Sequence, residues 1–365
     1  MLTEDLTNKI RNYFSYCVKE GLNLQKNQIV EIVGSSYLEE YIDLLAGECR
    51  PYTEDILINY TDGKILEEKI SNGYHKYILG DIKKYKDLIK KGFTRIVLTS
   101  PFTPAISLNE YDILEYKNCL RDLQFVNDYF LDLKSQKTII AVSNCYWAAK
   151  LQTTEESLWE DIFKFLDVKS NLDAKRLSEL KLKKLKFETK AGTNLTVSLT
   201  KNFKFQDKYQ IAKNGIKFCP NVPCLEAYTA PIKYGVNGIL VSSKPVYYKG
   251  YVAQNYKVKF KNGKIVDTNL DKNILLDDTM YYCGEISMVD YFNDKNFYSV
   301  LLNENTGCHL ALGYAYTFGI KNKKLINKSD HHLDLVFGDD STNVVGIDYD
   351  GNKILIFKDG KYIYE

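Results

Sequence analysis

The chain has 365 residues, enough for two domains or one large one with an ample core. Its formal net charge is only +2 and its charged residues are mixed throughout, which argues against nucleic acid or a membrane as its main partner. No apolar run approaches the ~20 residues of a membrane span, and the first residues lack the pattern of a secretory signal. We therefore expect a soluble, cytoplasmic protein whose eight cysteines, none in a CxxC pair, are reduced.

The first half of the chain alternates between patterns typical of helices and of strands. The predicted elements are a helix over 3–22, a strand over 29–34, a helix over 36–51, a strand over 55–62, a helix ending within 85–92, a strand over 94–101, a helix over 116–133 and a strand over 137–144. This alternation predicts an α/β layer with a mostly parallel sheet. GxGxxG and Walker sequences are missing at the strand ends, so a nucleotide site is not supported. Ser100 and Ser143 lie at strand ends without a GxSxG elbow, and we interpret them as ordinary loop serines.

Two further helices are predicted over 153–168 and 172–185, and the sequence then becomes rich in β patterns. The β signals are alternating stretches over 186–200 and 244–267 and the hairpin dipeptides Asn262–Gly263, Asp350–Gly351 and Asp359–Gly360. We therefore expect an N-terminal α/β domain over residues 1–182 and a C-terminal β-rich α+β domain over residues 183–365.

Three of the four histidines fall within residues 303–340, beside several acidic residues. His332 and Asp334 stand two apart in HLDLVFG, which predicts a strand, and side chains two apart on a strand point to one face. An imidazole and a carboxylate that converge in this way suit a divalent cation such as zinc, cobalt or manganese. The alternative is that these are ordinary polar residues at the rim of a core. His309 opens HLALGYAY, which we interpret as the start of a packed helix.

Two carboxylates upstream strengthen the hypothesis of a metal site. Glu226 in NVPCLEAYTAP and Glu285 in YYCGEISMV each stand alone among apolar neighbours, where a carboxylate is costly to bury unless it is paired or metal-bound. With the residues above they give four carboxylates and two histidines, enough ligands for two ions rather than one. The stretch over 303–340 itself contributes the candidates Glu304, His309, Asp330, His331, His332 and Asp334. The C-terminal domain therefore carries every candidate site residue.

A structural zinc site made of thiolates is the competing hypothesis. Four cysteines lie within a few residues of the candidate ligands, namely Cys219, Cys224, Cys283 and Cys308. Short-spacing pairs are missing among them, and cysteine is often simply a small buried apolar residue. We therefore favour the carboxylate and histidine site.

The same stretches resemble a known family. NVPCLEAYTAP, GEISMV, NENTGCHLALGYAY and HLDLVFG are similar, in this order, to the site motifs of the thermophilic-type metalloaminopeptidases, the bacterial aminopeptidase T, aminopeptidase S and aminopeptidase II enzymes. Residues 20–34 resemble the opening helix-turn-strand of the family more weakly, so the resemblance covers most of the chain. It implies a metalloaminopeptidase, a hydrolase that releases single N-terminal residues from peptides with a free N-terminus.

The resemblance also implies the roles of single residues. It implies two divalent ions (zinc, cobalt, manganese or magnesium), which can activate water, polarise a peptide carbonyl and bind an α-amino group. The ligands that it implies, called the proposed ligands below, are Glu226, Glu285, Glu304, His309, His332 and Asp334. Tyr316 matches the family's catalytic tyrosine, whose hydroxyl can donate a hydrogen bond to an oxyanion, although most of the 29 tyrosines of the chain only pack. Glu226 and Glu285 are the catalytic carboxylates, and it stays open which is the general base and which bridges the ions.

The chain departs from the family pattern in three places. Leu225 stands where a second acid is usual, Asp290 stands where a proline is common, and the 286–308 segment is shorter. His331 matches no ligand, and we expect it at the surface or behind the site.

The resemblance implies a homodimer with enclosed active sites. A catalytically inactive metal-binding or scaffold protein, or a metal-dependent amidohydrolase of another substrate, remains the alternative.

Overall fold

The structure is a computed structural model that describes residues 3–104, 112, 114–115, 119, 121–248, 251–317 and 320–364. The contacts between residues divide the chain into two compact units. Unit 1 comprises Met1–Leu166 and Tyr209–Val222, and unit 2 comprises Asp167–Lys208 and Pro223–Glu365. The boundary proposed at residues 182–183 lies inside unit 2 in this division.

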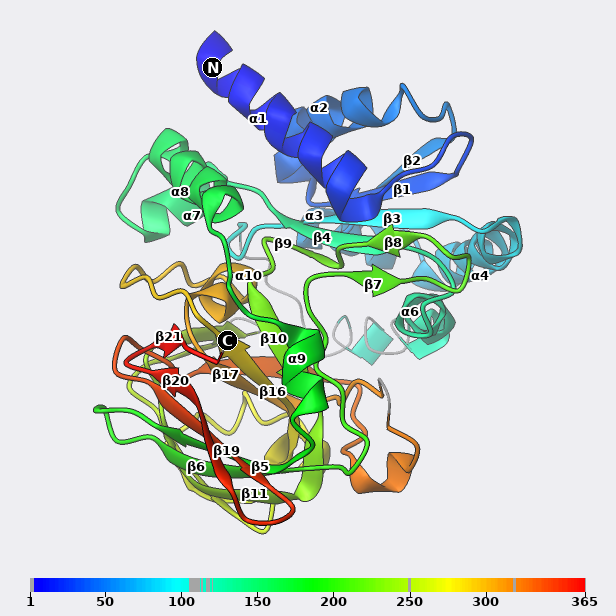
Figure 1. The fold of residues 1–365 in the computed structure, drawn as a ribbon. Coiled ribbons are helices and arrows are strands. Elements are labelled where there is room, and N and C mark those ends of the chain that lie inside the picture. The colour runs from blue at the N-terminus through cyan, green and yellow to red at the C-terminus, as the bar shows by residue number, and fades with distance from the viewer. Residues whose placement is uncertain are drawn as a thin grey trace. The chain divides into compact units, whose positions relative to one another are not determined.

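Unit 1 is built on a parallel sheet with the strand order β2-β1-β3-β4-β9, which confirms the predicted α/β layer. The strands are β1 (Val30–Gly34), β2 (Ile56–Tyr60), β3 (Thr94–Thr99), β4 (Lys137–Ala141) and β9 (Asn221–Val222), with a separate short pair β7 (Gln210–Ile211) and β8 (Lys217–Phe218). The helices are α1 (Glu4–Tyr16), a π-helical turn (Cys17–Leu22), α2 (Glu39–Cys49) after a 3₁₀ turn (Ser36–Leu38), α3 (Gly63–Ser71), α4 (Tyr74–Lys91), α6 (Gln124–Leu131), α7 (Cys145–Lys150) and α8 (Glu155–Asp167). Figure 1 shows α1 and α2 together on one side of this sheet.

Local sequence explains these elements. The helix α1 buries Leu6, Ile10, Tyr13 and Phe14, whose spacing of three and four residues gives one apolar face. Every residue of β1 is buried, as expected of an inner strand of a parallel sheet. For the helix predicted over 116–133, α6 confirms the second part, whereas residues 116–118 and 120 lie outside the described residues.

Among the described residues, unit 2 contains two larger antiparallel sheets and the two-stranded sheet β12-β13, which confirms the predicted β-rich character. One has the order β15-β14-β11-β6-β5-β19-β20-β21 and the other the order β10-β16-β17-β18. The strands of the larger sheet are β5 (Leu182–Glu188), β6 (Asn194–Leu199), β11 (Pro231–Val241), β14 (Lys257–Lys261), β15 (Lys264–Thr268), β19 (Asn343–Asp348), β20 (Lys353–Lys358) and β21 (Lys361–Tyr362). Those of the smaller sheet are β10 (Glu226–Thr229), β16 (Cys283–Val289), β17 (His309–Gly313) and β18 (His332–Val336). The remaining elements are α9 (Ala174–Glu179), β12 (Val246–Tyr248), β13 (Tyr251–Ala253), α10 (Val300–Asn303) and the 3₁₀ turns Asp278–Tyr281, Glu304–Thr306 and Lys323–Leu325.

The predicted hairpins are present. Asn262 and Gly263 join β14 to β15 with φ angles of 51° and 79°, and Asp359 and Gly360 join β20 to β21 with 48° and 72°. Two successive positive φ angles are what a tight two-residue hairpin turn requires. Asp350 and Gly351 lie in the connection between β19 and β20.

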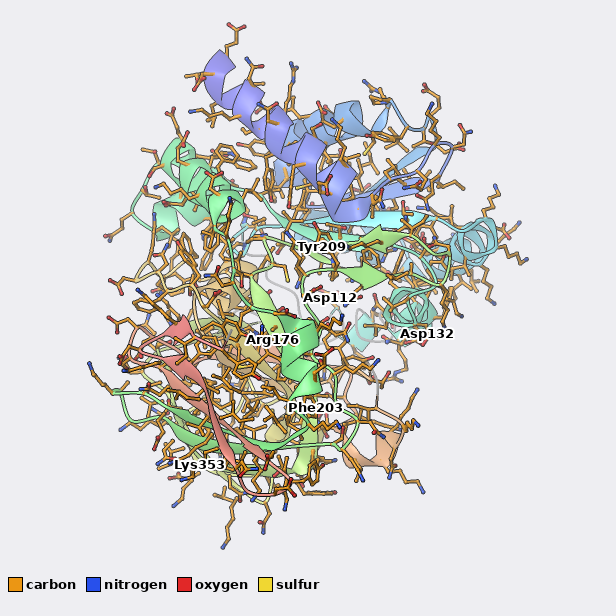
Figure 2. The ribbon with its side chains drawn as sticks, viewed as in Figure 1. Asp112, Asp132, Arg176, Phe203, Tyr209 and Lys353 are labelled. Atoms are coloured by element: carbon orange, nitrogen blue, oxygen red, sulfur yellow. The ribbon has the colours of Figure 1, made fainter. Side chains whose placement is uncertain are left out.

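The helix predicted over 172–185 is correct only in its first part. The helix α9 ends at Glu179, Lys181 has a positive φ of 49°, and β5 begins at Leu182. Leu182 and Leu185 are three residues apart, a spacing that suits a helix and would put them on opposite faces of a regular strand. Both are nevertheless buried, because the register between β5 and β19 shifts at Asp348. Arg176 of α9, labelled in Figure 2, has its guanidinium 5.1 Å from the ring centre of Tyr364.

In the part of the chain that the structure describes, every helix is too short or too polar to cross a membrane.

Candidate metal centre

The smaller sheet of unit 2 separates polar from apolar side chains. Residues directly opposite each other share a face, and Ser287 pairs with His309 while Ala311 pairs with Asp334. One face therefore presents the polar residues of the candidate site together with Tyr228, Val289, Ala311 and Val336; these polar residues are Glu226, Glu285, Ser287, His309, His332 and Asp334. The opposite face presents Ala227, Ile286, Met288, Leu310, Leu312, Leu333 and Leu335, all part of the core of unit 2. The alternating sequences GEISMV, HLALG and HLDLV produce this division, because successive side chains of a strand point to opposite faces.

The helix predicted from His309 onward is wrong, because His309–Gly313 is strand β17. A run of five small and apolar residues is too short for its periodicity to separate a helix from a strand. Pairing with β16 on one side and β18 on the other decides the outcome. The strand predicted around His332 and Asp334 is confirmed as β18.

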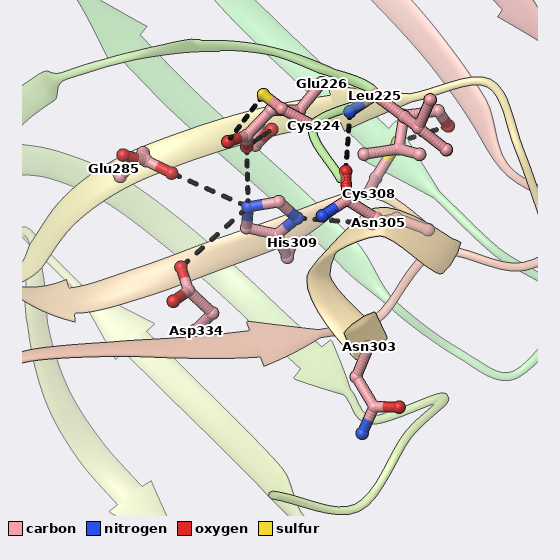
Figure 3. A network of polar contacts seen from close by, with 12 residues as sticks. Cys224, Leu225, Glu226, Glu285, Asn303, Asn305, Cys308, His309 and Asp334 are labelled. Atoms are coloured by element: carbon pink, nitrogen blue, oxygen red, sulfur yellow. Dashed lines mark hydrogen bonds and ion pairs between the residues drawn. The ribbon is translucent and has the colours of Figure 1, made fainter. Parts of the chain in front are cut away.

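His309 is the centre of the polar cluster in Figure 3. Its Nε2 atom lies 3.0 Å from Glu226 Oε2, 3.5 Å from Glu285 Oε1 and 3.8 Å from Asp334 Oδ1. These four residues are buried, and each comes from a different strand of the sheet. Side chains more than a hundred residues apart in sequence therefore meet around one imidazole.

Both histidines of the cluster have the same orientation. Nδ1 of His309 faces the carbonyl oxygen of Gly307 at 3.3 Å, and Nδ1 of His332 faces that of Tyr314 at 3.2 Å. An Nδ1–H that donates to a carbonyl leaves the lone pair on Nε2, which in His332 lies 3.3 Å from Asp334 Oδ1. A backbone partner on the far nitrogen is the usual arrangement of a metal-bound histidine.

Among the described residues, two sets of three have donor atoms within 4.8 Å of one another. One is Glu226, Glu285 and His309, and the other is Glu285, His332 and Asp334. Glu304, in the 3₁₀ turn before β17, is buried beside these sets. Burial first, and then the charges of Asp334 and Glu226, raise the pKa of Glu304 well above its ordinary value. The structure thus brings all six proposed ligands into one region of unit 2.

The cluster holds more negative charge than the nearby cations balance. Among the described residues, the ion pairs of Glu226, Glu285 and Asp334 go only to the two histidines. Burial and the charge on Glu226 raise the pKa of Glu285 to about 7, although the hydrogen bond from His309 lowers it. Burial lowers the pKa of His309, but the carboxylates of Glu226 and Glu285 outweigh it and raise that pKa well above its ordinary value. In a protein without ions, protons must therefore supply the missing positive charge.

Glu31 in unit 1 shows the ordinary solution to the same problem. It is fully buried in the apolar strand β1, yet Arg95 Nη2 lies 2.6 Å from its Oε2 and the Tyr85 hydroxyl donates to its Oε1 at 2.6 Å. A buried charge is tolerated when it is paired and hydrogen-bonded in this way. Glu226, Glu285 and Asp334 have no such arginine among the described residues, so divalent cations are the fitting counter-charge.

The spacing of the donor atoms also fits metal ions. Two ligands about 2.0–2.1 Å from a tetrahedral ion lie roughly 3.3 Å apart. The closest approaches here are 3.0 Å between His309 Nε2 and Glu226 Oε2, and 3.3 Å between His332 Nε2 and Asp334 Oδ1. Imidazole nitrogen with carboxylate oxygen is a donor set used for zinc and for neighbouring transition metals. The residues present therefore fit divalent metal ions.

Tyr316 lies beside the cluster, in the segment that follows β17. Its ring centre is 5.8 Å from that of His332 and 5.6 Å from that of Tyr228. Burial, followed by the charges of Glu285 and Asp334, raises the pKa of Tyr316 well above its ordinary value. The phenol therefore keeps its proton and can act as a hydrogen-bond donor.

The other candidates from the sequence have different surroundings. His331 Nε2 lies 3.5 Å from Asp277 Oδ2 and belongs to neither donor set. Asp290 uses both carboxylate oxygens on Ser170 and Asn171, and the Leu225 side chain is buried. The Ser100 hydroxyl accepts a hydrogen bond from Asn144 Nδ2, and the Ser143 hydroxyl donates one to the Glu155 carbonyl oxygen.

The thiolate hypothesis gains no support from the structure. Cys219, Cys283 and Cys308 each direct the thiol at a backbone carbonyl oxygen, and the donor sets found among the described residues contain no cysteine. Cys224 has its Sγ 4.0 Å from Glu226 Oε1 and is half-buried.

Two residues next to the ligands were missed by the sequence analysis. Ser287 is fully buried, and its hydroxyl donates to Glu226 Oε2 at 2.7 Å. Asn305 accepts a hydrogen bond from the backbone of Leu225. The alternation of GEIS, which puts Ser287 on the same face as Glu285, could have identified the first, whereas no local pattern identifies the second.

Comparison with known proteins agrees with this geometry. The family described as "Thermophilic metalloprotease (M29)" matches residues 6–362. The chain is similar to aminopeptidase AmpS of Bacillus subtilis (26% identity over 99% of this chain and 100% of that protein) and to aminopeptidase 2 of Geobacillus stearothermophilus (29% identity over 76% and 74%). Its fold is similar to that of wild-type AmpT from Thermus thermophilus, with a TM-score of 0.85, 19% identity and coverage of 98% and 100% of the two chains.

Proposed function

We propose that this chain, which belongs to the thermophilic metalloprotease family (M29), is a metal-dependent aminopeptidase that releases single N-terminal residues from peptides. The observation that carries the proposal is a set of buried carboxylates, with buried His309 and half-buried His332, on one face of a four-stranded sheet. The names of two relatives that match most of the chain, both aminopeptidases, support the substrate class.

The proposal includes two ions. Glu226 and His309 would hold one ion and His332 and Asp334 the other, and Glu285, which belongs to both donor sets, would contribute to both. Glu304 completes the ligands from the turn before β17. When bound, such ions lower the pKa of water and polarise a peptide carbonyl, and zinc, cobalt, manganese and magnesium are the candidates.

The side chains of this chain supply the remaining steps. The Tyr316 hydroxyl donates to the oxygen of the scissile carbonyl as negative charge develops on it. Glu226 or Glu285 accepts the proton of the attacking water. Glutamine variants distinguish the two. Loss of metal in one variant would assign that residue as a ligand, and a variant that keeps its metal but loses kcat would identify its residue as the general base rather than a ligand.

A panel of aminoacyl-nitroanilides, each with a free or an acetylated N-terminus, tests the proposal in the presence of added zinc, cobalt or manganese. We expect hydrolysis only of the free forms, abolished by a chelator and restored by metal. Tight metal binding without turnover would instead indicate an inactive metal-binding protein, and hydrolysis of the acetylated forms a different amidohydrolase.

Two expectations from the sequence remain part of the proposal. A homodimer with enclosed sites would admit peptides and exclude folded proteins, and sedimentation tests it directly. A monomer, or trimming of a folded protein with a buried N-terminus, would contradict it. The cytoplasmic location is tested by cell fractionation.

A further inference from the structure

The side chain of Asn305 connects two parts of the candidate metal centre. Asn305 is 1% exposed and lies in the 3₁₀ turn between Glu304 and β17. Its Oδ1 accepts a hydrogen bond from the Leu225 N–H at 2.6 Å, and its Nδ2 donates to the carbonyl oxygens of Leu301 at 2.8 Å and Pro223 at 3.3 Å. A single amide therefore holds its own turn and the backbone immediately before Glu226.

The sheet makes this connection only indirectly, through β16. In the order β10-β16-β17-β18, the strand that begins at Glu226 is separated from the strand that begins at His309 by β16. Nevertheless, Glu226 Oε2 must come within 3.0 Å of His309 Nε2. Asn305 links the start of β10 to the turn before β17, across the intervening strand. It holds the backbone immediately before Glu226, while the Ser287 hydroxyl donates to the Glu226 carboxylate.

We infer that Asn305 is a positioning residue that sets the distance between Glu226 and the segment from Glu304 to His309, and thereby the affinity for divalent ions. This inference rests on the proposed function. The amide touches no proposed ligand atom, so it acts through the backbone of Leu225 and through its own turn. Partners behind the ligands typically change metal affinity or activity by about 10–100-fold when they are removed.

The chain offers a matched control two residues away. Asn303 is also buried, at 4% exposure, and its Oδ1 accepts from the Phe297 N–H at 3.0 Å while its Nδ2 donates to Pro245 and Asn296. It has as many hydrogen bonds as Asn305, but none of its partners adjoins a proposed ligand. Figure 3 shows the Asn303 amide directed away from His309, whereas that of Asn305 faces Leu225.

The experiment compares Asn305→Ala with Asn303→Ala. Affinity for zinc and cobalt is measured by competition with a chromophoric chelator, the cobalt d–d absorption reports ligand geometry, and the melting temperature of the metal-free protein reports folding. We expect both variants to lower the metal-free melting temperature. Only Asn305→Ala should weaken metal affinity, by about 10–100-fold, and alter the cobalt spectrum. Asn305→Ser, which leaves a smaller cavity, serves in the same assay if Asn305→Ala does not fold.

The outcomes test the role of Asn305 and the proposed function separately. Wild-type affinity and spectrum in the Asn305 variants, or an equal loss in Asn303→Ala, would show that Asn305 is merely structural and would overturn the inference while leaving the proposed function intact. Absence of metal binding by the wild-type protein would overturn both.

Discussion

Single residues at the metal centre combine packing with chemistry, and Tyr316 is the clearest case. Its ring packs near Tyr228, Tyr314 and His332, while its hydroxyl stays protonated beside a cluster of carboxylates. Packing depends on the ring and catalysis on the hydroxyl, so one substitution separates them.

Tyr316→Phe keeps the ring and removes the donor. If the hydroxyl stabilises the oxyanion, we expect kcat to fall about 100–1,000-fold, with a much smaller change in KM and unchanged metal content. Steady-state kinetics and a metal assay on the same sample measure this. An unaltered kcat at full metal content would mean that Tyr316 only packs.

The adjacent histidines provide a second test at this scale. His332 Nε2 faces Asp334, whereas His331 Nε2 faces Asp277. We expect His332→Ala to weaken metal affinity by more than the ~10–100-fold typical of partners behind the ligands. His331→Ala should be far milder. Equal metal dissociation constants for the two variants would show that the assignment of the strand face is wrong.

At the scale of elements, the approach of β17 to the start of β18 is closer than a side chain allows. Gly313 ends β17 with φ 97°, and a Cβ atom there would lie 2.1 Å from the carbonyl oxygen of His331. Only glycine adopts this backbone conformation without strain and leaves room for His331. The next residue, His332, begins β18, so this contact also determines where a proposed ligand lies.

We therefore expect Gly313→Ala to destabilise the protein by about 1–3 kcal/mol and to weaken metal binding. Gly47→Ala is the matched control, because Gly47 lies inside helix α2, where an added Cβ atom would meet nothing within 4 Å and alanine should raise helix propensity. Thermal unfolding of both variants measures the difference. A Gly313→Ala variant as stable as Gly47→Ala would contradict the close approach.

At the scale of the whole molecule, the site links stability to pH and to metal. The pKa of Glu285 rises from 4.5 to about 7 and that of His332 from 6.5 to about 9 in the folded chain without ions. For both groups burial is the leading cause, raising the pKa of Glu285 and lowering that of His332, where the charge of Asp334 outweighs it. Between pH 4.5 and 9 these two groups therefore bind more protons in the folded state than in the unfolded state, and their contribution to stability falls as pH rises. Burial lowers the pKa of Lys137 and of Lys244 to about 8, so these lysines oppose the trend near and above pH 8.

We expect the melting temperature of the chelated protein to fall across roughly pH 5–8. Divalent ions need deprotonated ligands, so the gain in the free energy of unfolding on metal binding should grow over the same pH range. It should reach about 2.7 kcal/mol when the free metal concentration is about 100 times Kd. Scans with a chelator and with zinc at each pH measure both curves. Parallel curves would contradict a site in which metal ions replace protons.

The sequence by itself determined the features that depend on near neighbours. Alternation over HLDLV specified β18 and its two-residue polar spacing, and the Asn-Gly and Asp-Gly pairs specified the turns, because these properties need only local backbone geometry. Glu226 and Glu285 could be singled out because an isolated carboxylate in an apolar run requires a partner.

Only the tertiary structure decided what that partner is. Glu31 has the same apolar surroundings in sequence as Glu285, but Arg95, 64 residues away, neutralises it, whereas Glu285 meets Glu226, His309 and Asp334. The same holds for HLALG, where the flanking strands decide between helix and strand, and for Asn305, whose partner Leu225 is 80 residues distant. Charge neutralisation and strand pairing act through space, so local sequence predicts the need for a partner but not its identity.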